Sequence, residues 1–354
     1  MAREVLPRPN LQTVRGATVL RSRKLKIAVL AGALVLKCAA SEAETYPLPP
    51  AGDDVIGVIR KLVTREQDTL LDIGRRFGLG YGEITAANPG VDPWLPGEGT
   101  HVVVPTQFIL PPGPRRGLVL NISQLRLFYF PIAKPGQAAR VMTFAIGIGT
   151  DYARTPLGQT RIIRKAADPI WRPSQDIREE HAAEGHWLEA EVKAGPLNPL
   201  GKYALYLAMP GSYLIHGTNK PWGVGMRVSH GCIRMYPEGI ESLYSQVPVG
   251  TAVRIIDEPY LFGWRARQPY LQVFPRAETA QATTLTPAVK TILERLPYTH
   301  APDWDRIMTA LSEQRGLPMP IALGTPALSD LLETAPEVVE TAPALPDENS
   351  EKAP

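Results

Sequence analysis

The chain has 354 residues, enough for two domains with appendages rather than one core. Its net charge of +3 and its 21% of charged residues are ordinary for a globular protein, so the composition gives no reason to expect nucleic-acid binding. Only two cysteines occur, Cys38 and Cys232, which excludes a fold held together by a disulfide framework.

Residues 1–43 have the pattern of a secretory signal peptide. Basic residues at 21–26 precede the apolar run Ile27–Leu36 and a group of small residues that ends at Ala43. The apolar run is too short to span a bilayer. We therefore expect export and cleavage near Ala43, with an uncleaved anchor as the alternative. Cleavage would leave Cys232 as the only thiol.

The next two segments are a short linker over 44–56, rich in proline and glycine, and a compact unit over 57–105. Apolar residues at helical spacing predict a helix that starts after Thr69, where a side-chain cap is available. Residues 83–88 predict a second short helix, and Val102–Val104 predicts a strand. The order of the unit is therefore β-α-α-β.

This compact unit resembles a LysM module. The residues that carry the resemblance are Gln67-Asp68-Thr69-Leu70, Ile73, Phe77, Ile84, Asn88 and Val104-Pro105. LysM modules bind glycans that contain N-acetylglucosamine, so the resemblance implies that residues 57–105 hold the protein on peptidoglycan glycan strands. The alternative is a spacer of the same fold that binds no glycan.

A proline-rich hinge is expected over 106–116, and a mostly β domain over 117–258. Its predicted strands are 118–122, 125–130, 141–148, 161–163, 204–208, 213–215 and 253–256, and its predicted helices are 177–184 and 239–246. Residues 259–330 form an extension with a predicted strand at 270–274 and predicted helices at 286–296 and 303–313. The tail over 331–354, rich in Pro, Ala and Glu, is expected to be disordered.

The residues best suited to catalysis are His216 and the segment 229–235 (SHGCIRM), which contains His230 and Cys232. A free thiol is only a few per cent ionised at neutral pH, and a nearby imidazole can supply the base that it lacks. On an extended strand, His230 would share the face of Cys232. Gly231 permits a substrate carbonyl to approach the neighbouring backbone amides.

Two other interpretations of these residues are possible. With His181 or His186 they could form a zinc site, although no CxxC or HxxxH spacing accompanies them. They could also be core residues that only satisfy hydrogen bonds.

The whole domain resembles the YkuD-type L,D-transpeptidases, closest to the ErfK/YbiS/YcfS/YnhG group. In that family a histidine precedes a Ser-His-Gly-Cys-x-Arg signature, as His216 precedes residues 229–234 here. Further matching segments are 147–149 (GIG), 155–158 (TPLG), 169–173 (PIWRP), 195–201 (GPLNPLG) and 227–229 (RVS). The resemblance implies a β-sandwich-like catalytic domain.

The family's roles can be carried over position by position. Cys232 would be the nucleophile and His216 the general base and acid. The remaining implied site residues are Gly217, whose carbonyl would orient His216; Gly231 and Cys232, whose amides would form the oxyanion hole; Ser229 and His230 as support; and Arg234, Asn219 and Arg227 for substrate binding.

The implied reaction is a two-step acyl transfer without metal or cofactor. Cys232 would attack the meso-diaminopimelate carbonyl of a tetrapeptide stem and release D-Ala, and an amine would resolve the thioester. The partners would be stem peptides and glycan strands in the periplasm, with an outer-membrane lipoprotein or protein as further candidate acceptors, and carbapenems as inhibitors. The alternatives are a hydrolase or L,D-carboxypeptidase with the same thiol, and a non-catalytic glycan-binding protein.

Overall fold

The computed structural model describes residues 44–275, 294 and 301–338, so the expected signal segment lies outside the described residues. The structure is mostly β, as predicted. The strands are β1 (Glu44–Pro47), β2 (Val55–Gly57), β3 (Arg60–Val63), β4 (His101–Val104), β5 (Gln107–Ile109), β6 (Gly117–Asn121), β7 (Arg126–Phe130), β8 (Arg140–Gly149), β9 (Gly158–Ala167), β10 (Tyr203–Leu207), β11 (Leu214–His216), β12 (Arg227–Ser229), β13 (Ile233–Met235), β14 (Ala252–Ile256), β15 (Tyr260–Arg265), β16 (Gln268–Val273) and β17 (Met319–Pro320).

The helices of the described residues are few and short. They are α1 (Leu70–Arg76), α2 (Tyr81–Ala87), α3 (Gln175–Ala183), α4 (Pro237–Gln246), α6 (Trp304–Glu313) and α7 (Leu328–Glu333), with a 3-10 turn at Pro221–Gly223. None of them is long and apolar enough to cross a membrane.

The central sheet is built around two ten-residue strands, β8 and β9, that change partners halfway along. The first part of β9 pairs with β14 and the second part with β10. Similarly, β8 pairs with β7 over its first part and with β13 near its end. The strand order β8-β13-β11-β10-β9-β14-β6-β7 therefore closes on itself through β7 and β8. The two sheets of the expected sandwich are continuous through these shared strands.

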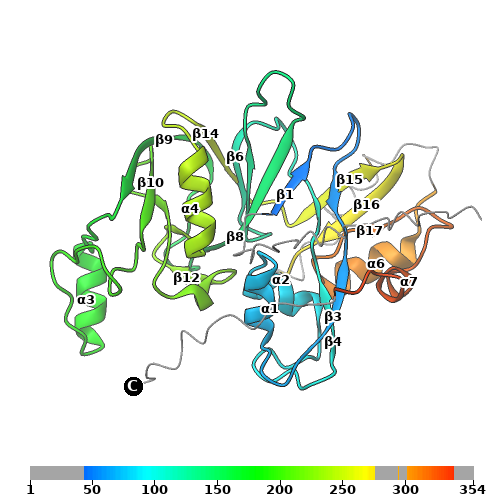
Figure 1. The fold of residues 1–354 in the computed structure, drawn as a ribbon, viewed down its shortest axis with the longest axis horizontal. Helices are drawn as coiled ribbons and strands as arrows, with labels where there is room; N and C mark the ends of the chain where they lie inside the picture. Colours follow the sequence, from blue (N-terminus) through cyan, green and yellow to red (C-terminus); the bar gives the residue numbers. More distant parts are fainter. Residues whose placement is uncertain (1–43, 276–293, 295–300, 339–354) are drawn as a thin grey trace, which may run out of the picture. The chain divides into compact units, whose positions relative to one another are not determined.

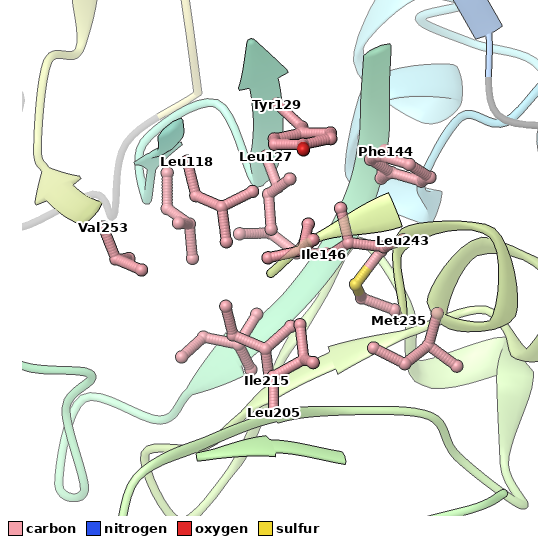
Figure 2. Close-up of a cluster of buried hydrophobic side chains, with 14 of the residues drawn as sticks. Leu118, Leu127, Tyr129, Phe144, Ile146, Leu205, Ile215, Met235, Leu243 and Val253 are labelled. Atoms are coloured by element: carbon pink, nitrogen blue, oxygen red, sulfur yellow. The ribbon is translucent and has the colours of Figure 1, made fainter. Parts of the chain in front are cut away.

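The main core lies between the two halves of this sheet. Figure 2 shows Leu118 and Leu127 on one side facing Leu205 and Ile215 on the other, with Leu243 of α4 closing one end. These side chains are almost fully buried. The helix α4 packs against β10 (Figure 1). The core thus fixes β11 and β13, the strands next to the site residues.

The second face of β6 and β7 is also buried. Successive side chains of a strand point to opposite faces, so Val119 and Phe128 belong to a second hydrophobic core. The partners in that core come from the N-terminal unit, among them Leu70, Ile84 and Phe108. The N-terminal unit and the large sheet therefore share one core.

The N-terminal unit has the predicted β-α-α-β order. Strands β3 and β4 pair antiparallel, and α1 and α2 lie between them in sequence. The helix α1 begins where expected, because the Thr69 hydroxyl accepts a hydrogen bond from the Asp72 amide at 3.0 Å. The buried Asn88 amide donates to the carbonyl oxygens of Ile84 and Val103 and ties α2 to β4.

The expected linker over 44–56 and hinge over 106–116 both contain paired strands. In the first, β1 pairs with β8 at the edge of the large sheet, a position where proline is tolerated. In the second, β5 is fully buried and pairs with β2. Neither segment is a free connection, because its apolar residues are needed to complete a core.

The C-terminal extension forms a three-stranded sheet, β15-β16-β17, packed with α6. Of the expected helix over 286–296, only residue 294 lies among the described residues. The expectation of disorder from residue 331 onward is wrong for 331–338: Ala335 is buried, and the Val338 amide donates to the Lys61 carbonyl oxygen at 2.8 Å. The apolar residues of this segment pack against the rest of the protein, which a composition rich in Pro, Ala and Glu does not predict. Residues 339–354 lie outside the described part.

Candidate active site

His216 ends strand β11 and is 3% exposed. Its Nδ1 lies 2.6 Å from the carbonyl oxygen of Gly217, and the backbone of Leu200 also hydrogen-bonds the ring. Strand β10 pairs with β11 so that Ala204 lies opposite His216. The imidazole is therefore fixed in orientation by backbone groups on two sides.

Cys232 directly precedes β13, which runs parallel to β11 and pairs Ile233 with Ile215. The thiol is largely buried and hydrogen-bonds with the backbone of Leu214, two residues before His216. In this register Cys232 lies level with Leu214 and His216 pairs with Arg234, so the two adjacent strands hold the thiol and the imidazole two residues apart along the strand direction.

The electrostatics of this site favour neutral groups. Burial, with a contribution from the Arg234 charge, lowers the pKa of His216 to about 4. Burial raises the pKa of the Cys232 thiol above its usual value, while the Leu214 hydrogen bond and the Arg234 charge act in the opposite direction. The resting site therefore holds a thiol and a neutral imidazole, not the thiolate that a nearby histidine would suggest. A neutral imidazole is the form that can accept the thiol proton during attack.

The turn before Cys232 is held by two hydroxyl groups. Ser229 Oγ accepts from the Gly231 amide at 3.2 Å and donates to the Cys232 carbonyl oxygen at 2.6 Å. Thr155 Oγ1 donates to the Gly231 carbonyl oxygen at 2.9 Å and accepts from the Gly149 amide at 3.0 Å. The Gly231 amide, one of the two expected oxyanion donors, is thus hydrogen-bonded to Ser229 in this structure.

Gly231 has a backbone φ of +103°, and a side chain there would lie 2.7 Å from the ring of Tyr213. Residues 230–232 therefore form a turn and not an extended strand. The expectation that His230 and Cys232 share one face is wrong for this reason. His230 is instead held at the surface: its Nε2 lies 2.6 Å from Oε2 of Glu180 on α3, and both side chains are substantially exposed.

The expected substrate-binding residues lie in different surroundings. Arg234 is half-buried and close enough to affect the pKa values of both His216 and Cys232. Asn219 donates through Nδ2 to the Pro196 carbonyl oxygen at 3.1 Å, and its Oδ1 is buried without a hydrogen-bond partner among the described residues. Arg227 is exposed and donates to the Ile122 carbonyl oxygen at 3.4 Å, in the turn between β6 and β7.

The zinc interpretation needs three or more ligating side chains in one place. Within the described ranges, which include all the histidines named above, no group of three or more His, Cys, Asp or Glu side chains is arranged to hold a metal ion. His216 and His230 instead contact a backbone carbonyl oxygen and a carboxylate oxygen, respectively.

Four residues of the site did not stand out as candidates in the sequence. Thr155 belongs to the TPLG segment, and that motif was the available signal. The other three contribute through their position in the fold. The Leu200 backbone contacts His216, and the Tyr213 ring lies against Gly231. The Glu180 carboxylate contacts His230, 50 residues later in the sequence. Leu200 belongs to the GPLNPLG segment, which was its available signal, whereas no local pattern marks Tyr213 or Glu180.

Comparison with known proteins identifies the family. The YkuD family model, the L,D-transpeptidase catalytic domain, matches residues 115–255. The chain is 37% identical over 301 residues to the probable L,D-transpeptidase ErfK/SrfK of Salmonella typhimurium, covering 81% of this chain and 94% of that protein. It is 42% identical over 242 residues to the probable L,D-transpeptidase YcfS of Escherichia coli, covering 67% and 74% of the two chains.

The likeness to YbiS of Escherichia coli, also named a probable L,D-transpeptidase, is 37% over 305 residues, or 81% of this chain and 95% of that protein. Among solved structures, L,D-transpeptidase 3 from Mycobacterium tuberculosis aligns over 44% of this chain and 67% of that one at 20% identity, with a TM-score of 0.29 that is too low to carry weight. On the sequence relationships, the chain belongs to the L,D-transpeptidase family of transferase enzymes.

Proposed function

We propose that this protein is a peptidoglycan L,D-transpeptidase that uses Cys232 as its nucleophile. The observation that carries the proposal is the pairing of β11 with β13, which sets a buried thiol beside the strand that ends in a backbone-oriented, neutral imidazole. Family membership supplies the substrate class, the tetrapeptide stems of peptidoglycan.

The first step forms a thioester. Cys232 Sγ attacks the meso-diaminopimelate carbonyl while its proton passes to His216. The oxygen that gains charge is stabilised by the Cys232 amide. As the C–N bond breaks, His216 returns the proton to the departing amine of D-Ala. Arg234, half-buried next to both groups, offers a positive charge for the carboxylate of the leaving D-Ala.

The second step regenerates the thiol. An amine acceptor attacks the thioester carbonyl, the C–S bond breaks, and the sulfur takes up a proton. The acceptor is the amine of another stem peptide, which gives a 3-3 cross-link, or an amine of an outer-membrane lipoprotein or protein.

Product analysis tests this function. Purified protein incubated with a disaccharide tetrapeptide and an amine should release D-Ala and yield a product in which the amine is attached to the tripeptide, as seen by mass spectrometry. A tripeptide with a free carboxylate as the only product would establish the hydrolase instead. No release of D-Ala at any enzyme concentration would contradict the proposal.

We further propose that the N-terminal unit is a LysM module that binds glycan, and that the enzyme works in the periplasm after export. Trp94 is 56% exposed in the loop between α2 and β4. The Asp92 carboxylate accepts from the amides of Trp94 and Leu95 at 2.8 and 2.9 Å, which holds the loop and lowers the pKa of Asp92. An ordered, exposed indole is a suitable surface for the apolar face of a sugar ring.

Replacing Trp94 by alanine is expected to weaken binding to isolated sacculi about five-fold, which corresponds to roughly 1 kcal/mol for one lost aromatic contact. Turnover of a soluble disaccharide tetrapeptide should not change. Trp304→Ala is the matched control, because Trp304 is 40% exposed but lies on α6, outside the unit. Equal retention of all three proteins on sacculi would show that the unit is a spacer.

A further inference from the structure

The long connection between β9 and β10, residues 168–202, contacts both histidines of the site. Its Leu200 backbone hydrogen-bonds His216, and its Glu180 carboxylate contacts His230. Asn198 holds the two ends of this connection together. Its side chain is fully buried and donates to the carbonyl oxygens of Pro169, Val192 and Lys193. The connection is thus an ordered wall of the site.

The two histidines have different environments. His216 is 3% exposed and oriented by uncharged backbone groups, while His230 is 41% exposed and paired with a carboxylate that is 57% exposed. A carboxylate that contacts one ring nitrogen of an imidazole holds the ring in one orientation. The pair Glu180–His230 has this arrangement, two residues from the nucleophile.

The two half-reactions make different demands on a base. The donor step needs a base for a buried thiol, which His216 supplies. The acceptor step begins with an alkyl ammonium ion, which is protonated at neutral pH and arrives from solvent. A cation from solvent is attracted by an exposed carboxylate, and it must lose a proton before it can attack. The buried His216, with its pKa of about 4, is poorly suited to that task.

We propose that Glu180 is an acceptor-side positioning residue, which attracts the cationic amine and orients His230 to deprotonate it. This inference rests on the proposed transpeptidase function. In the step, the ammonium gives one proton to His230, its nitrogen forms a C–N bond with the acyl carbonyl, and the C–S bond breaks. The second proton of the nitrogen passes to the sulfur of Cys232, and His230 releases its proton to solvent.

The helix α3 itself supports a functional role for this contact. None of its residues is buried, so the helix contributes no side chain to a hydrophobic core. Its neighbouring carboxylate, Glu179, accepts a hydrogen bond from Gln175 Nε2 in the preceding turn of the same helix at 2.6 Å. Glu179→Gln therefore provides a control for charge on the same helix, away from His230.

The test separates the two half-reactions of the full-length chain. Acyl-enzyme is formed with a disaccharide tetrapeptide, and its decay is followed with two nucleophiles, Nα-acetyl-lysine amide, which is a cation, and hydroxylamine, which is uncharged at neutral pH. Glu180→Gln should slow aminolysis by the lysine derivative at least about 10-fold, less than the 10²- to 10⁴-fold contribution of a general base itself, because the variant keeps His230 and loses only the group that positions it. Decay with hydroxylamine and the preceding acylation should change much less, and Glu179→Gln should behave as the parent.

Three results would overturn the inference. Glu180→Gln could react normally with the lysine derivative, it could slow both nucleophiles equally, or it could slow acylation as much as aminolysis. A parent protein that forms no acyl-enzyme would refute the proposed function itself. That outcome is read in the first half-reaction and is therefore distinct from a failure of the Glu180 assignment.

Discussion

Replacing His216 by alanine is expected to slow acylation of Cys232 by about 10²- to 10⁴-fold at neutral pH, the usual contribution of a positioned general base. The physical reason is that the buried thiol, with its raised pKa, is protonated at neutral pH and needs a base during attack. The imidazole is neutral under these conditions and held by Gly217. Stopped-flow measurement of acyl-enzyme formation gives the rate directly.

The pH dependence of acylation supplies an independent check on His216. Its neutral form is the base, so the rate should be constant at neutral pH and fall as the pH falls through about 4. An imidazole with an ordinary pKa would produce the same fall near 6.5. The His216→Ala variant should lack this acid limb. A loss of rate centred near pH 6.5 in the parent protein would contradict the buried, neutral histidine.

Replacing Arg126 by methionine is expected to destabilise the protein by about 3–5 kcal/mol, the range for breaking one half of a buried ion pair. Arg126 is fully buried, and its guanidinium donates to both carboxylate oxygens of Glu83 at 2.6 and 2.7 Å. It also donates to the Gly78 carbonyl oxygen at 3.0 Å and to Thr143 Oγ1 at 3.1 Å. Methionine leaves the Glu83 carboxylate without its cation.

Denaturant unfolding measures the effect, with Arg172→Met as the control. Arg172 pairs with Glu191 at 2.6 Å, but both side chains are at least half exposed, so its loss should cost less than about 1 kcal/mol. Because Arg126 lies on β7 and Glu83 on α2, the pair joins the large sheet to the N-terminal unit. Equal small losses for both variants would show that this junction contributes little to stability.

The same junction shows what sequence patterns can and cannot predict. The unbroken apolar run over 127–130 is typical of a strand buried on both faces, and β7 is buried throughout. The pattern does not say what covers the second face, because that partner, the core of the N-terminal unit, comes from residues 56–110. Similarly, the prolines beside β1 indicate a linker, and only its pairing with β8 shows otherwise.

For the site, the motif around Cys232 identified residues that the fold brings together, since β11 and β13 are adjacent. Local patterns failed where backbone geometry decides. The positive φ of Gly231 breaks the extended conformation between His230 and Cys232, and the Gly231 amide donates to the Ser229 hydroxyl. The Glu180–His230 contact joins residues far apart in sequence, which no spacing rule relates.

Peptide mapping of the trapped acyl-enzyme tests the central claim most directly. The protein is incubated with a disaccharide tetrapeptide, or with a carbapenem as a slowly released acyl donor, then quenched in acid, digested and analysed by mass spectrometry. We predict one acyl group per chain, on the peptide that contains Cys232, and none on the Cys232→Ser variant. An adduct on another residue, or one that survives in Cys232→Ser, would contradict the assignment of the nucleophile.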